Sequence, residues 1–158
     1  MMKLFTSGMF VFAGVVSLPT GMSHRQTAMH PVPEYRSDPR LATLRDFFRK
    51  SDCPAEKYSA AFLDAADQYE LDWRLLPSLS FIESTGGKFA IHNNLFGWDS
   101  GRAHFPTATA GIHAVGYRLA NSHLYRDKDL DGLLATYNPN ADYAQKVKSV
   151  MRRISPSE

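Results

Sequence analysis

Glu83 is the residue of this sequence whose surroundings point most directly to chemistry. The stretch Trp73–Ser84 is predicted to form a helix, because its apolar residues recur at spacings of three and four. These residues are Leu75, Leu76, Leu79 and Ile82. Glu83 falls within the same stripe around the helix axis, so we expect its carboxylate to face the core side rather than bulk water.

This position favours an uncharged carboxyl group. Burial disfavours the charged form, and Glu83 also precedes the expected helix stops Gly86 and Gly87, where the negative end of the helix dipole opposes ionisation. A carboxylic acid that keeps its proton near neutral pH can act as a general acid, and a glycosidic oxygen is a leaving group that needs one. From the helix alone, the alternative is a structural carboxylate that caps nearby loop amides.

A second carboxylate is harder to identify. The other glutamates are Glu34, Glu56, Glu70 and Glu158. Asp99 is the one aspartate in the loop-rich segment 86–107, which makes it the best candidate. Its carboxylate could activate water or stabilise a sugar oxocarbenium ion, although capping the turn before Ser100 and Gly101 is the simpler role.

Segment 86–107 combines amide side chains with aromatic rings. Amides form hydrogen bonds with the hydroxyl and acetamide groups of sugars, and aromatic faces stack on the apolar side of a pyranose ring. The candidates for sugar binding are Asn93, Asn94, Phe96 and Trp98. The aromatic residues could instead form a small core of the loop, an interpretation that we favour for Phe96 and leave open for Trp98.

Three short segments occur in an order found in a known enzyme family. They are Ile82-Glu83-Ser84-Thr85-Gly86-Gly87, Asn93-Asn94-Leu95-Phe96-Gly97-Trp98 and Tyr137-Asn138-Pro139. In this combination the chain resembles the lysozyme-like glucosaminidases of glycoside hydrolase family 73, and more distantly the lytic transglycosylases, from Ala55 to Ile154. The resemblance implies a mainly α, lysozyme-like single domain with a loop-rich small lobe. It also implies a substrate, the glycan strands of peptidoglycan or a related N-acetylglucosamine polymer.

The resemblance assigns roles to particular residues. In that family the glutamate at this helix end, here Glu83, is the general acid. The family usually has a bulky aromatic residue where this chain has Thr85 or Gly86, so the local pocket is expected to differ.

The chemistry does not require a second protein carboxylate, because in substrate-assisted hydrolysis the 2-acetamido oxygen of the sugar attacks the anomeric carbon. By resemblance to a Tyr-Asn motif of the family, Tyr137 is the candidate for the hydroxyl that orients the acetamide. Asn138 beside it is a candidate for substrate binding. The alternative for Tyr137 is a tyrosine packed under the last helix.

The predicted function is therefore that of a peptidoglycan hydrolase, an endo-β-N-acetylglucosaminidase with Glu83 as its single general acid. Two alternatives remain: a lytic transglycosylase that forms 1,6-anhydro-muramic ends, and a non-catalytic cell-wall-binding or assembly module. No cofactor is expected for any of these activities.

No metal site is expected either. Asp127–Gly132 resembles the first half of a calcium loop, but Asn138 stands at the twelfth position, where such a loop has a bidentate glutamate. Asp129 or Asp131 can equally cap the helix that follows. The six histidines show no spacing typical of metal ligands.

The elements that must position these residues are predicted to be helices. Helical spacing of apolar residues, with Pro54 at one helix start, marks five segments besides the one that carries Glu83. These segments are 41–48, 54–69, 112–121, 129–136 and 143–154. Pro77 lies either in the first turn of the Glu83 helix or at a kink within it.

The N-terminal region predicts export. Residues 1–23 contain one cation, Lys3, followed by an apolar run that is short for a membrane span, as in a secretory signal peptide; an uncleaved anchor is the alternative. Residues 24–40 have the composition of a Pro-rich linker, which places the glucosaminidase domain at 41–158. The expected location is the periplasm, the cell wall or the extracellular space.

Composition limits the class of partner. The chain has 158 residues and a formal net charge of +2, which argues against a nucleic-acid binder and is compatible with an anionic cell-wall polymer. Cys53 is the single cysteine, so no intramolecular disulfide can form, and no sequence signature marks it as a nucleophile. We expect a monomer that acts on peptidoglycan glycan strands and has no stable membrane span after processing.

Overall fold

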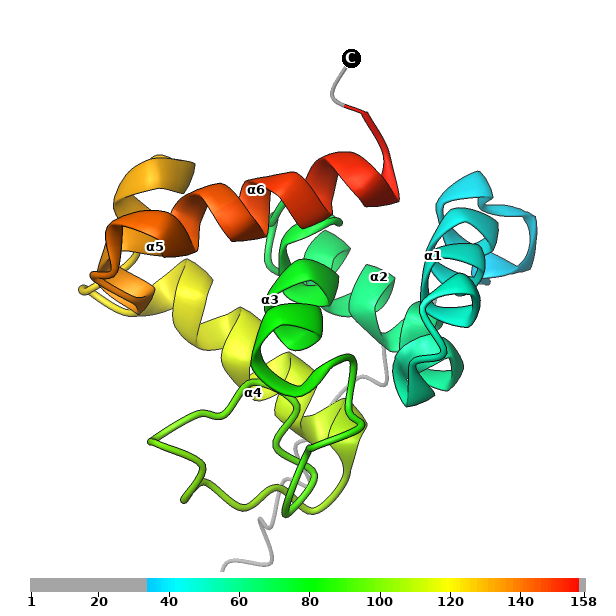
Figure 1. Ribbon diagram of the computed structural model, residues 1–158, viewed down its shortest axis with the longest axis horizontal. Helices are drawn as coiled ribbons and strands as arrows, with labels where there is room; N and C mark the ends of the chain where they lie inside the picture. Colours follow the sequence, from blue (N-terminus) through cyan, green and yellow to red (C-terminus); the bar gives the residue numbers. More distant parts are fainter. Residues whose placement is uncertain (1–33, 157–158) are drawn as a thin grey trace, which may run out of the picture. The chain divides into compact units, whose positions relative to one another are not determined.

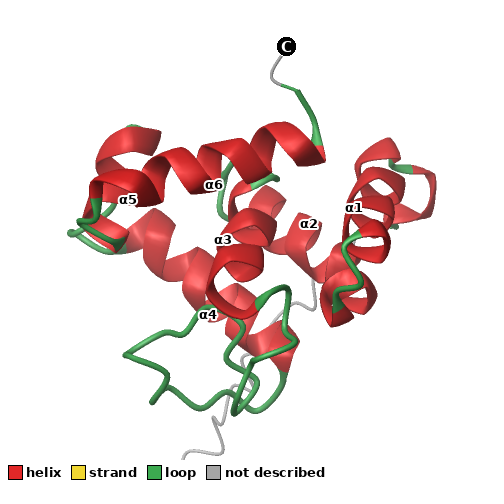
Figure 2. Ribbon diagram, viewed as in Figure 1, coloured by secondary structure: helices red, strands yellow, loops and turns green. Residues whose placement is uncertain are grey.

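The computed structural model describes residues 34–156, which contain six α-helices and two short 3-10 helices joined by loops (Figure 1). Their bounds are η1 Tyr35–Ser37, α1 Pro39–Lys50, η2 Pro54–Tyr58, α2 Ser59–Gln68, α3 Leu75–Ser84, α4 Ala108–Asn121, α5 Leu130–Tyr137 and α6 Ala141–Ile154. Within this range there is no β-strand, only an isolated bridge between Ile91 and Asn94. The predicted mainly α, single-domain class is confirmed (Figure 2).

Side-chain caps set where several helices begin. Asp38, Thr107, Asp129 and Asn140 each accept a hydrogen bond from a backbone N–H of the first turn that follows. These caps start α4 and α6 earlier than their apolar patterns suggested, because a capped first turn needs no apolar residue. The predicted signal segment 1–23 and residues 24–33 of the predicted linker lie outside the described residues.

Helix α3 begins at Leu75, two residues later than predicted. Pro77 is its third residue, in the first turn, where a missing N–H breaks no helical hydrogen bond. The interpretation as an N-terminal turn is therefore confirmed. The helix ends at Thr85, which adopts a left-handed conformation with φ of 52°, and the Gly86 N–H donates to the Ser80 carbonyl.

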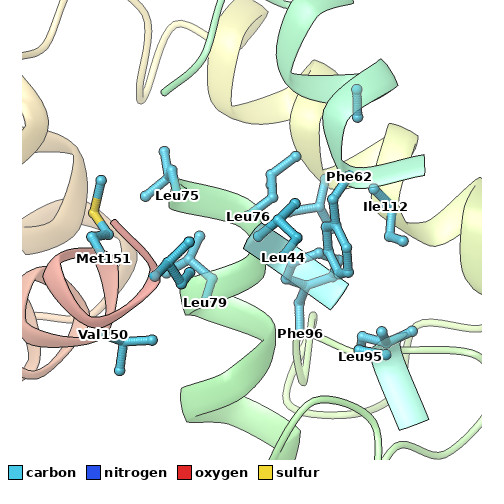
Figure 3. Packing of buried hydrophobic residues seen from close by; sticks show 14 of the residues in the cluster. Leu44, Phe62, Leu75, Leu76, Leu79, Leu95, Phe96, Ile112, Val150 and Met151 are labelled. Carbon is cyan, nitrogen blue, oxygen red and sulfur yellow. The ribbon is translucent and has the colours of Figure 1, made fainter. Parts of the chain in front are cut away.

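The core surrounds α3, which packs against α2 and α6, while α4 packs against α2. Figure 3 shows Leu75 and Leu79 of α3 beside Val150 and Met151 of α6. The other part of the core is aromatic. Phe62 of α2 stacks on Phe48 and meets the edge of Phe96, with ring centroids 5.7 and 6.5 Å away. Phe96, which comes from the long loop between α3 and α4, therefore joins that loop to the helices.

The folded domain starts before the predicted boundary at Leu41. Tyr35 of η1 is buried, and its hydroxyl donates to Asp67 at 2.9 Å. Arg40 bridges Asp38 and Asp67 on the same side of the domain. Residues 35–40 thus belong to the domain rather than to a linker. Among the described residues, no helix combines the length and the apolarity needed to cross a membrane.

The aromatic contact between loop and helices leads to a stability prediction. Phe62→Ala should lower the free energy of unfolding by about 3–5 kcal/mol, because Phe62 is fully buried and its loss leaves a cavity between Phe48 and Phe96. The matched control is Phe89→Ala, since Phe89 is 76% exposed and should change stability by less than about 0.5 kcal/mol. Urea unfolding followed by circular dichroism measures both values. Equal losses in the two variants would contradict this description of the core.

Candidate active site

Glu83 lies in the last turn of α3 and is exposed, so the prediction that its carboxylate is kept from bulk water is wrong. The first two turns of α3 are buried on nearly all sides, but in the last turn Ser84 is the one buried residue. The apolar stripe gives the correct side of the helix. In the last turn, however, this side of α3 borders a cavity instead of packed side chains.

Tyr143, the third residue of α6, donates a hydrogen bond from its hydroxyl to Oε1 of Glu83 at 2.6 Å. Tyr143 is buried, and burial together with this hydrogen bond raises the pKa of its hydroxyl well above its ordinary value. The hydroxyl therefore stays protonated at physiological pH and remains a donor. One carboxylate oxygen of Glu83 is fixed in this way.

The other oxygen, Oε2, lies beside Gly97. Gly97 has a φ of 57°, and a Cβ at this position would come within 3.4 Å of Oε2. A side chain here would be strained, and its Cβ would be in van der Waals contact with Oε2. Gly97 and Glu83 both line the cavity described next.

A cavity of about 360 Å³ opens at Glu83; we call it the acid cavity. Its lining residues are Glu83, Phe96, Gly97, Trp98, Asp99, Ser100, Tyr125, Tyr137 and Asn138. Four of these residues are aromatic, but the surface that they and their neighbours expose to the cavity is mostly polar. Tyr137 stacks on Tyr143 with centroids 5.8 Å apart and meets Trp98 at 5.7 Å. The structure thus brings together six of the residues predicted from the sequence, whereas Asn93 and Asn94 do not line this cavity.

The prediction that Asn94 contacts a sugar is corrected by the structure. Asn94 is 2% exposed, and its amide is used by the loop itself. Its Nδ2 donates to the carbonyls of Trp98 and Ala103, and its Oδ1 accepts from the Trp98 N–H. Asn93 is exposed, but its Nδ2 donates to the Phe105 carbonyl at 2.9 Å and lies away from the acid cavity. Both amides hold backbone, a role that an amide in a loop performs as readily as it binds sugar.

Asp99 lines the acid cavity but is committed to its own turn. Asp99 has a φ of 53°, and its Oδ1 accepts from the Arg102 guanidinium at 2.8 Å. The side chains of both residues are largely exposed. This arrangement matches the turn role that the sequence suggested as the simpler one. Phe96 is 1% exposed and packs on Phe62, as the core interpretation predicted.

The Tyr137 hydroxyl donates to the Phe96 carbonyl at 3.1 Å, so it ties α5 to the loop. Burial, and then the nearby charge of Glu83, raises the pKa of Tyr137 well above its ordinary value. Its hydroxyl proton is donated to that carbonyl, while lone pairs of the oxygen remain to accept a hydrogen bond.

Tyr143 was not predicted as the partner of Glu83, because its helical spacing to Val147 indicates a core residue.

The turn at Gly86 has no room for a side chain. A Cβ at Gly86 would lie 2.7 Å from Cβ of Cys53, so a larger side chain would force the start of η2 away from α3. Cys53 is buried, and burial raises the pKa of its thiol, which makes the thiolate unfavourable.

The aspartates of segment 127–132, which resembles the first half of a calcium loop, make other contacts. Asp129 caps α5, Asp131 pairs with Lys148, and Asp127 lies 3.7 Å from Arg126. Across the described residues there is no group of three His, Cys, Asp or Glu side chains that could hold a metal ion.

Comparisons with models of known protein families and with curated protein sequences found no match to this chain. The function must therefore be argued from the geometry of the site and from the resemblance of its motifs.

The role of Asn94 is testable. Asn94→Ala removes three hydrogen bonds and takes away the partner of the Trp98 N–H and of the Ala103 carbonyl, so the free energy of unfolding should fall by about 1–3 kcal/mol. The matched control is Asn121→Ala at the exposed end of α4, which should cost less than about 0.5 kcal/mol. Urea unfolding gives both values, and an equally small loss in both variants would show that the Asn94 amide does not organise the loop.

Proposed function

We propose that this protein is an exported peptidoglycan hydrolase, an endo-β-N-acetylglucosaminidase in which Glu83 protonates the departing glycosidic oxygen. The observation that carries the proposal is the hydrogen bond from Tyr143 to Glu83, whose carboxyl group lines a cavity together with Trp98 and Tyr137. The motif resemblance to family 73 glucosaminidases supports the same assignment.

The contacts of Glu83 divide its two oxygens into separate roles. Tyr143 donates to Oε1, so a proton on the carboxyl group is best carried by Oε2, which is the oxygen beside Gly97 and the cavity. From there the proton passes to the glycosidic oxygen as the bond between that oxygen and the anomeric carbon breaks. The resulting carboxylate keeps the hydrogen bond from Tyr143.

The nucleophile is supplied by the substrate in this proposal. Because Asp99 is paired with Arg102 in an exposed turn, the 2-acetamido oxygen of the sugar is the better candidate to attack the anomeric carbon. Tyr137 can orient that group. Its proton is donated to the Phe96 carbonyl, so its oxygen can accept a hydrogen bond from the acetamide N–H. Water then opens the cyclic intermediate, and Glu83 takes up the proton that the water releases.

Replacing the acid tests the proposal directly. Glu83→Gln should lower the rate of glycan release from purified sacculi by about 10²–10⁴-fold, because the amide can accept from Tyr143 but cannot donate an acidic proton. The matched control is Glu70→Gln, an exposed glutamate in a turn outside the cavity, which should retain full activity. Full activity of Glu83→Gln would end the assignment of Glu83 as general acid.

Mass spectrometry of the fragments released by the unaltered protein distinguishes the alternative functions. Reducing N-acetylglucosamine ends support the glucosaminidase, and 1,6-anhydro-muramic ends identify a lytic transglycosylase with the same acid. Binding to sacculi without release would indicate a wall-binding module.

Tyr143 acts as a positioning residue, which gives a separate prediction. Tyr143→Phe keeps the ring that stacks on Tyr137 but removes the hydroxyl that holds Glu83, so kcat should fall about tenfold with KM little changed. The matched control is Tyr117→Phe, since Tyr117 is exposed and far in sequence from this contact. Steady-state kinetics on solubilised glycan strands measure both parameters. An unchanged kcat in Tyr143→Phe would show that the contact has no part in the reaction.

A further inference from the structure

A second cavity, of about 540 Å³, adjoins the acid cavity. We call it the Arg118 cavity; among the residues that line it are Trp98, Asp99, Phe105 and Arg118. Trp98 and Asp99 line both cavities. A polymer bound at Glu83 can therefore continue past Trp98 into the Arg118 cavity.

Trp98 is held firmly between the two cavities. Asn94 binds both its N–H and its carbonyl, at 2.9 Å in each case. Its ring meets Tyr137, which lines the acid cavity, and the guanidinium of Arg118 lies 5.6 Å from the ring centroid. Arg118 thus covers one face of a ring whose position is fixed by the loop and by Tyr137.

Arg118 brings a positive charge to this cavity. It is exposed and lies in the last turn of α4. Among residues 34–156 its guanidinium forms no ion pair, and its contact is with the Trp98 ring. The nearest acid of the lining, Asp99, is already paired with Arg102. A guanidinium that lies over the Trp98 ring and has no ion-pair partner among the described residues can bind the carboxylate of a ligand that enters this cavity.

We propose that the Arg118 cavity binds a carboxylate-bearing aminosugar unit next to the sugar at Glu83, with Arg118 as the ligand of that carboxylate. The inference rests on the proposed function for the position of the glycan, and it specifies the substrate class as an anionic glycan rather than a neutral N-acetylglucosamine polymer. In peptidoglycan the carboxylate belongs either to the lactyl group of the muramic sugar or to its peptide stem. Both sources offer Arg118 the same chemistry.

Binding to the inactive Glu83→Gln protein tests this proposal without turnover. Three ligands are compared by titration calorimetry: neutral N-acetylglucosamine oligomers, glycan strands stripped of peptide, and strands that keep their peptides. In the Glu83→Gln background, Arg118→Gln should weaken binding of the anionic strands about tenfold and leave the neutral oligomers unchanged. Added salt should weaken only the binding that Arg118 supports. The matched control is Arg126→Gln, because Arg126 is exposed and lines neither cavity.

The pattern across ligands decides the outcome. A loss confined to stripped strands assigns the lactyl carboxylate, and a loss confined to peptide-bearing strands assigns a stem carboxylate; either supports the proposal. Equal losses for neutral and anionic ligands would mean that Arg118 only supports Trp98, and no loss, or no binding of any ligand, would overturn the proposal. If binding depends on Arg118 but the unaltered protein cleaves nothing, the proposed function is contradicted and the Arg118 proposal stands. If the unaltered protein cleaves glycan but binding does not depend on Arg118, the Arg118 proposal is contradicted and the proposed function stands.

Discussion

The site depends on the buried amide of Asn94, which closes the loop between α3 and α4 on itself. The amide bonds to three backbone groups at once, and displacement of the loop would leave the buried amide unpaired away from water. Ser84 adds a second buried tie, because its hydroxyl donates to the Leu95 carbonyl at 2.7 Å. The end of α3 and the loop are therefore one structural unit, although the loop has no regular secondary structure.

Through this unit, the packing of the core fixes the positions of residues at the site. Phe96 inserts into the aromatic core beside Phe62 (Figure 3). The neighbouring Gly97 is thereby placed against Glu83. From the opposite side, the Tyr137 hydroxyl holds the Phe96 carbonyl. A segment anchored from both sides loses little further freedom when a ligand binds, so less of the binding free energy is spent on ordering it.

The sequence predicts the helices and the position of Glu83 because apolar periodicity reports which side of a helix is covered. It does not report what covers that side, so the exposure of Glu83 at the edge of a cavity was not foreseen. The two errors of assignment share a cause. The sequence does not distinguish an amide such as Asn94 that binds a sugar from one that binds backbone groups. The spacing of Tyr143 predicts that its ring is buried, but it does not predict what its hydroxyl contacts. Only the meeting of α3 with α6, far apart in sequence, reveals that contact.

The charges near the two cavities follow a simple arrangement. Tyr137 and Tyr143 stay neutral because burial raises their pKa values, and the Asp99 carboxylate is offset by Arg102. Two ionisable groups are left to act on a ligand: the Glu83 carboxyl group on one side of Trp98 and the Arg118 guanidinium on the other. A neutral sugar at the acid and an anionic group past the tryptophan would match this arrangement. The reverse placement would leave Arg118 without an anionic partner. Under the proposed function, Arg118 thus favours one register of an alternating glycan over the register shifted by one sugar, which in turn selects the bond that lies at the acid.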